Sequence, residues 1–222
     1  MLDDASVKNI TTEDIELAAE TLLEEYRITS KRDRFPILVE NIAEQFLGYN
    51  IDITNEGLFA NPKLLGGISF ETDTIFVNAS IEDHEGRYNF TIAHEIGHHV
   101  LHKEIFCNSL VSKDKILCRE ISTKPLAEQQ ADRFAAALLM PRKEITGAVG
   151  LQKSKSIYEA LKVAKKVQET LKIDNVSTSA IINRMKDLNL IDNSIPYQSG
   201  KYWKNKNIRL PLLLKLKRCF FL

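Results

Sequence analysis

One short stretch, His94-Glu95-Ile96-Gly97-His98, constrains this chain more than any other, because it sets two imidazoles and a carboxylate at helical spacing. On an α-helix, residues four apart differ by about 40° of rotation and ~6 Å of rise, so His94 and His98 can direct ring nitrogens to one ion. Glu95 then lies beside that ion, where it can take a proton from a bound water. The stretch therefore predicts a zinc site that carries its own general base.

The surrounding residues indicate that this stretch lies on a buried helix. Apolar residues at helical spacing continue on both sides of it, and Gly97 permits close approach of another backbone. We expect the helix to begin near Asn89 or Thr91, because either side chain can cap a first turn. The apolar positions are Ile92, Ile96, Val100 and Leu101.

A zinc site needs a further ligand, and Glu128 is the best candidate. Segment 124–141 has a proline near its first turn and another after its end, as helices often do, and Glu128 lies in line with its apolar stripe. Asp132 follows one turn later, where it can accept the outer ring N–H of a ligating histidine. The alternatives are surface roles: a helix-dipole contact for Glu128 and an arginine ion pair for Asp132.

The other histidines are expected to make no contact with the metal. His102 continues the spacing, but it lies ~12 Å along the helix from His94, too far for the same ion. His99 points about 100° away from His98, which favours packing or exposure. His84 precedes the helix in a polar loop, from which a mobile histidine could assist in a transition state.

These motifs resemble the ImmA/IrrE family of zinc peptidases, which are found on bacterial mobile elements and in stress-response loci. The resemblance covers about residues 15–145, and its two C-terminal blocks are specific. The four blocks are Ile42-Ala43-Glu44, Gly66–Ser69 with Thr74–Asn78, Arg87–His102 and Glu128–Pro141.

The resemblance implies a zincin-like domain that binds Zn²⁺ through His94, His98 and Glu128, with Glu95 as the catalytic base. It also implies an endopeptidase that cleaves a helix-turn-helix repressor at one site and so relieves repression. The alternative is a regulator that sequesters a repressor or toxin without cutting it; the presence of Glu95 favours cleavage. The donor that stabilises the oxyanion stays open among Tyr88, His84 and Arg133.

Periodicity predicts an α+β fold, with a small antiparallel or mixed sheet before the active-site helix and a mainly helical module after it. We expect segment 68–77 to hold an extended substrate as an edge strand, through main-chain pairing. The expected helices are 12–26, capped by Thr12, and 36–46; the expected strands are 51–53, 68–70 and 74–77, with a turn at 71–73.

Charge divides the chain into unlike halves. Residues 1–141 hold 13 Lys and Arg against 24 Asp and Glu, a net −11, while residues 142–222 hold 17 against 6, a net +11. This asymmetry suits an acidic partner, nucleic acid or the acidic half itself, although a lysine-rich solvated surface explains it equally well. We expect a zincin-like domain at 10–145, a helical module at 146–195 and a basic, apolar tail at 196–222. Disorder is our first expectation for the tail, and a partner strand or an interfacial anchor of basic and aromatic type are the alternatives.

The basic half has the outline of a helix-turn-helix unit. An amphipathic helix over 156–171 is followed by a short break and a second helix capped by Ser177. Only Arg184 and Lys186 stand on that second helix to meet phosphates or bases, so direct nucleic-acid binding is weakly supported. We favour a scaffold or substrate-docking role for this unit.

Composition favours a cytoplasmic protein. The chain has no apolar run long enough to span a membrane and no basic-then-apolar leader at Met1. Its three cysteines form an odd, unpatterned set, as expected in a reducing compartment. The sequence specifies neither the repressor nor the oligomeric state.

Overall fold

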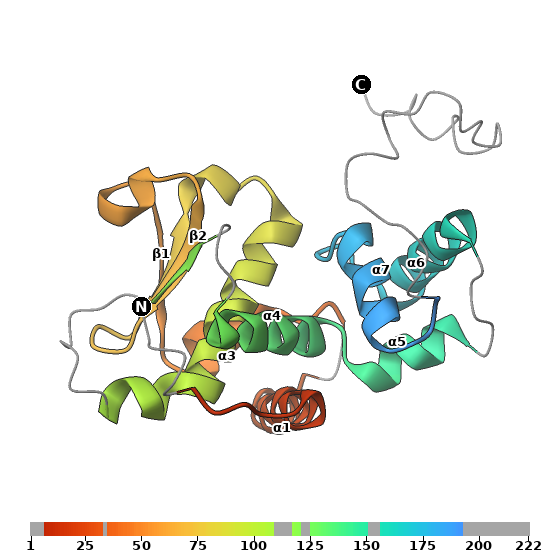
Figure 1. Cartoon of the computed structure of the whole chain (residues 1–222), viewed down its shortest axis with the longest axis horizontal. Helices are drawn as coiled ribbons and strands as arrows, with labels where there is room; N and C mark the ends of the chain where they lie inside the picture. Colours follow the sequence, from red (N-terminus) through yellow and green to blue (C-terminus); the bar gives the residue numbers. More distant parts are fainter. Residues whose placement is uncertain (1–6, 33–34, 109–116, 121–124, 151–155, 193–222) are drawn as a thin grey trace.

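The computed structural model describes residues 7–32, 35–108, 117–120, 125–150 and 156–192, and shows the expected α+β fold (Figure 1). Its sheet is mixed and has four strands in the order β1-β3-β2-β4. β1 runs parallel to β3, whereas β2 is antiparallel to both β3 and β4. The strands are β1 (Asn50–Thr54), β2 (Leu64–Ser69), β3 (Thr74–Asn78) and β4 (Leu117–Glu120).

Segment 68–77 was expected at an edge of the sheet, and this prediction is wrong. β2 and β3 are the two interior strands, and Ile68 pairs with Ile75 between them. The edges are β1 and β4. The sequence gave no signal for β4, because its four residues are too few to show a period and its partner lies far away in the chain.

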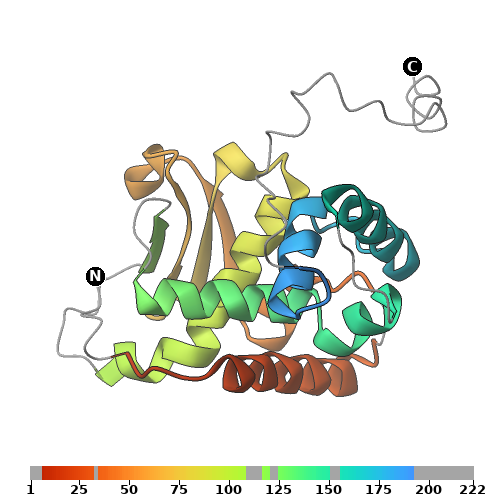
Figure 2. The same cartoon turned by 45° about the vertical axis from the view of Figure 1, so that its right-hand side comes forward.

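Helices cover the sheet on one side and extend away from it. α3 packs on β2 and β3, and α1 and α4 lie side by side against α3 (Figures 1 and 2). None of the described helices has both the length and the apolar character needed to cross a bilayer. The α-helices are α1 (Thr12–Ser30), α2 (Val39–Asn41), α3 (Glu85–Asn108), α4 (Leu126–Leu139), α5 (Arg142–Val149), α6 (Ile157–Leu171) and α7 (Thr178–Asp187).

Two of the N-terminal predictions need small corrections. The cap of α1 is Thr11 rather than Thr12, because Thr11 forms a capping box with Asp14. The helix predicted over 36–46 begins at Val39 and continues as a π-helical turn, Ile42–Phe46. Two short 3₁₀ turns, Gly57–Ala60 and Ala79–Ile81, flank the β2–β3 hairpin.

The active-site helix begins one turn earlier than predicted, at Glu85. The carbonyl of His84 accepts the backbone N–H groups of Arg87 and Tyr88 and so starts the helix. Thr91, a predicted cap, is instead fully buried inside the helix. A main-chain start of this kind has no side-chain signature.

The two C-terminal helices form as predicted. The Ser156 side chain caps α6 and the Ser177 side chain caps α7, and the two helices pack on each other at the end of the molecule away from the sheet (Figure 1). One apolar cluster continues from the helices around the sheet into α6 and α7. The predicted domain division near residue 145 therefore stays a prediction, and the predicted tail lies outside the described residues.

Arg184, one of the two basic residues considered for a nucleic-acid contact, does not face solvent. It is 2% exposed, because helical spacing sets it among the buried Ile181, Met185 and Leu188. Its guanidinium binds both carboxylate oxygens of Glu16 on α1 and donates from Nε to the Met140 carbonyl at 2.8 Å. This ion pair fastens α7 to the core.

We expect Arg184→Met to lower the free energy of unfolding by about 3 kcal/mol, because Glu16 stays buried and keeps only the more exposed Arg142 guanidinium, whose Nε lies 3.7 Å from Oε2, as its counter-charge. Lys186→Met, two positions away on the same helix, serves as the control for loss of a basic residue and should change stability much less. Urea unfolding followed by circular dichroism measures both. Equal stability of the two variants would contradict the role given to this ion pair.

Candidate metal centre

The side chains of His94, His98 and Glu128 converge where α3 meets α4. Nε2 of His94 lies 3.1 Å from Nε2 of His98 and 3.1 Å from Oε2 of Glu128, and Nε2 of His98 lies 3.2 Å from Oε1 of Glu128. Both histidines are 1% exposed. All three ligand atoms lie within 4.8 Å of one another, close enough to hold one metal ion.

Gly97 permits this convergence. A Cβ atom at position 97 would lie 3.2 Å from the Cα of Ala131 and 3.2 Å from the Cβ of Phe134, tighter than an ordinary contact. α3 and α4 therefore touch through their backbones one turn away from the three donors. The close approach brings the short Glu128 side chain up to both rings.

Asp132 lies where the sequence placed it, next to His94. Its Oδ1 is 3.0 Å from the outer nitrogen Nδ1 of His94. A carboxylate only accepts hydrogen bonds, so Nδ1 of His94 carries the proton and Nε2 presents a lone pair toward Glu128. This contact fixes both the ring orientation and the tautomer that a metal ligand needs.

The protonation states of the site also suit a metal. Burial lowers the pKa of His98 to about 4. Burial alone would raise the pKa of Glu128, but the two adjacent imidazoles more than offset this and hold that pKa below its usual range. Near neutral pH the site thus presents a neutral ring and a carboxylate, the protonation states in which the two groups can bind a cation. Two nitrogens and one oxygen form a ligand set that zinc takes.

Glu95 lies on α3 next to His94 and is 1% exposed. A Cβ atom at Gly66 of β2 would lie 3.2 Å from Oε1 of Glu95 and 2.4 Å from Cγ2 of Thr91. Strand β2 therefore runs directly against the predicted base. Glycine at position 66 is what leaves room for this carboxylate under the sheet.

The remaining predicted residues have other contacts. Nδ1 of His99 lies 2.8 Å from the hydroxyl of Tyr49, in agreement with a packing role. His84 is exposed, and the Tyr88 hydroxyl donates to Glu40 at 2.7 Å. Arg133 is exposed on α4. The choice of an oxyanion donor among His84, Tyr88 and Arg133 stays a prediction.

Sequence reasoning missed two residues near the site. His102 was dismissed as a metal ligand, but its Nδ1 lies 3.0 Å from Nδ1 of His98, and its Nε2 lies 2.9 Å from Oε1 of Gln130. The signal was present, since residues 94, 98 and 102 share one helix face. Gln130 had no signal beyond its place two residues after Glu128.

The fold and the site define a zincin-like α+β domain of the His-Glu-x-x-His type, with a glutamate from the following helix as the third candidate ligand. The chain matches the peptidase M78 family model, described as the IrrE N-terminal-like domain, over residues 49–179, and it belongs to this family. This result confirms the resemblance seen in the sequence and indicates a metallopeptidase. A search of curated proteins found no significant match.

We expect Gly97→Ala to weaken zinc binding, because the added methyl group pushes α3 and α4 apart and so separates His94 and His98 from Glu128. It should also cost about 1–3 kcal/mol of stability, as overpacking does. Competition with a chromophoric chelator measures the zinc affinity. Gly147→Ala in α5, where a Cβ atom meets nothing within 4 Å, is the matched control and should bind zinc normally. Equal affinities in the two variants would contradict this account.

We expect the metal-free protein to lose stability as the pH falls from 6.5, the ordinary pKa of histidine, toward about 4. In this window unfolded His98 takes up a proton that the folded site resists, so acid favours unfolding, by roughly 1–3 kcal/mol over the range. Urea unfolding in the presence of a chelator, at several pH values, measures the trend. His98→Gln should reduce the trend, and the remainder comes from His99 and His102, whose pKa values burial also lowers. A wild-type stability that stayed constant or rose on acidification would contradict this prediction.

Proposed function

We propose that this protein is a zinc-dependent endopeptidase that cleaves a helix-turn-helix transcriptional repressor at one site and thereby relieves repression. The observation that carries the proposal is the convergence of His94, His98 and Glu128 with Glu95 buried beside them. Family membership supports peptidase activity. The choice of substrate follows the resemblance to ImmA/IrrE proteins. On the same basis we propose that the protein acts in the cytoplasm, in regulation of a mobile element or a stress response.

In the proposed mechanism, His94, His98 and Glu128 hold the zinc ion, which when bound supplies Lewis acidity toward a water molecule and the scissile carbonyl. Glu95 accepts the proton of the attacking water and passes it to the leaving amine. Asp132 keeps the ring of His94 in its ligating orientation. The burial of Glu95 shields its carboxylate from bulk water, which strengthens its interactions with charge in the site.

The sheet suggests where the substrate lies. β4 forms the edge beyond β2, and β2 is the strand that runs against Glu95. Among the described strands, β4 has no partner on its outer side, and an extended peptide can pair its main chain there, as substrates do on sheet edges. We therefore place the substrate along β4 instead of the interior segment 68–77.

The test uses metal-loaded protein and the helix-turn-helix protein encoded next to it. We expect one discrete cleavage by wild type, and a rate about 10²–10⁴-fold lower for Glu95→Gln because the general base is lost. Glu95→Gln should keep its zinc, whereas Glu128→Ala should lose it. Glu104→Gln, an exposed glutamate of the same helix, is the matched control and should cleave like wild type.

Two results would overturn the proposal. A stable complex with the repressor, formed by zinc-loaded wild type without any cut, would identify a sequestering regulator. If purified wild type held no zinc after loading, the proposed metal centre would be contradicted.

A further inference from the structure

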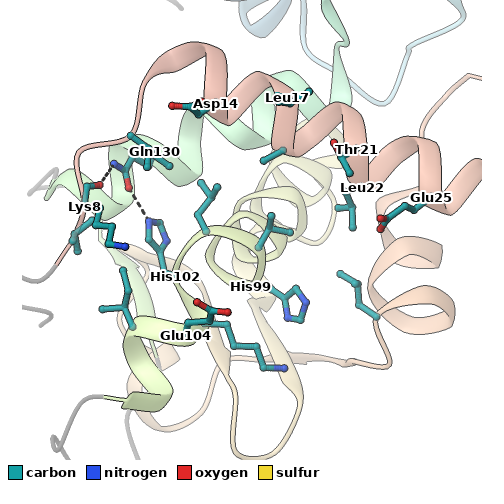
Figure 3. Close-up of a pocket in the computed structure, with 18 of the residues that line it drawn as sticks. Lys8, Asp14, Leu17, Thr21, Leu22, Glu25, His99, His102, Glu104 and Gln130 are labelled. Atoms are coloured by element: carbon teal, nitrogen blue, oxygen red, sulfur yellow. Dashed lines mark hydrogen bonds between the residues drawn. The ribbon is translucent and has the colours of Figure 1, made fainter.

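A chain of hydrogen bonds leads from the metal centre to the main chain near the N-terminus. His98 contacts His102, His102 contacts Gln130, and Nε2 of Gln130 donates to the carbonyl of Lys8 at 2.9 Å. The three side chains are each 1% exposed. Figure 3 shows the last two of these hydrogen bonds at one end of a groove of about 950 Å³ between α1 and α3.

The Lys8 carbonyl at the end of this series determines which group donates and which accepts in each of its hydrogen bonds. A backbone carbonyl only accepts, so the amide of Gln130 must direct its NH₂ group to Lys8 and its oxygen to His102. That oxygen also only accepts, so Nε2 of His102 carries a proton and Nδ1 of His102 is a bare acceptor. The neighbouring Nδ1 of His98 must then carry the proton, which leaves Nε2 of His98 as a lone pair.

This series of hydrogen bonds opposes the other tautomer of His98, in which the proton lies on Nε2. Oε1 of Glu128 lies 3.2 Å from Nε2 of His98 and, in the metal-free protein, attracts the ring proton to that nitrogen. A proton on Nε2 would occupy the position that a metal ligand must offer. A partner that holds the proton on Nδ1 therefore prepares the site for metal before the metal arrives.

We propose that His102 and Gln130 are positioning residues that keep the proton of His98 on Nδ1, so that Nε2 is presented to the metal as a lone pair. Asp132 holds the proton of His94 on Nδ1 in the same way. For His98 the acceptors are uncharged, and the series of hydrogen bonds ends on a main-chain carbonyl and not on a carboxylate. The proposal rests on the metal centre of the proposed function and is independent of which substrate is cut.

The direct test is made on metal-free wild type. Long-range ¹H–¹⁵N correlation spectra of protein labelled at histidine report which ring nitrogen carries the proton. We expect His98 as the Nδ1–H tautomer and His102 as the Nε2–H tautomer. The opposite tautomer at either residue would overturn the proposal even if zinc binding and cleavage were intact.

Zinc affinity tests the same residues with a matched pair. Leucine and asparagine have nearly the same shape, but only asparagine offers an oxygen to Nδ1 of His98. His102→Leu should bind zinc about 10–100-fold more weakly than wild type, and His102→Asn should restore most of this loss. Thermal unfolding of both variants verifies that they are folded, and equal zinc affinities in two folded variants would count against the proposal.

Gln130→Met tests the next bond. It keeps the length of the side chain, removes both hydrogen bonds and should release the tautomers of His102 and His98 in the same spectra. Gln129→Met, the exposed neighbour on α4, is the control and should leave both tautomers and the zinc affinity unchanged. If folded Gln130→Met kept the wild-type tautomers, the Lys8 carbonyl would not determine the tautomers of His102 and His98.

Discussion

The contact between α3 and α4 at Gly97 is the constraint on which the centre depends. Two of the three proposed ligands lie on one helix and the third on the other, so the distance between the helices sets the size of the site. Ala131 and Phe134 press against Gly97 from α4, and the sheet holds α3 from the opposite side through Gly66. The centre is thus positioned by backbone packing on both sides.

The features of this protein that the sequence predicts are those whose signals lie within one short segment. The His94 and His98 pair follows from helical spacing alone, and Glu128 follows from a helix with clear proline signals at both ends. The cap at Ser177 was found for the same reason, since a cap is a local feature. These residues are where sequence reasoning is strongest.

Other features depend on tertiary structure and had no local signal. The position of β4 at the edge is set by pairing with β2, a strand some fifty residues earlier in the sequence. Arg184 looked like a surface cation, because a sequence does not show that Glu16 lies opposite it, 168 residues away. His102 was judged only by its distance from the metal, whereas its contact is with the far side of a ligand.

The carbonyl of Lys8 has a consequence for how this centre can be mapped by mutagenesis. The group that ends the hydrogen-bond chain belongs to the main chain, and the Lys8 side chain itself is exposed. An alanine scan would therefore pass over position 8, since alanine keeps the same carbonyl. A residue whose side chain can be replaced without effect can still contribute to the site through its backbone.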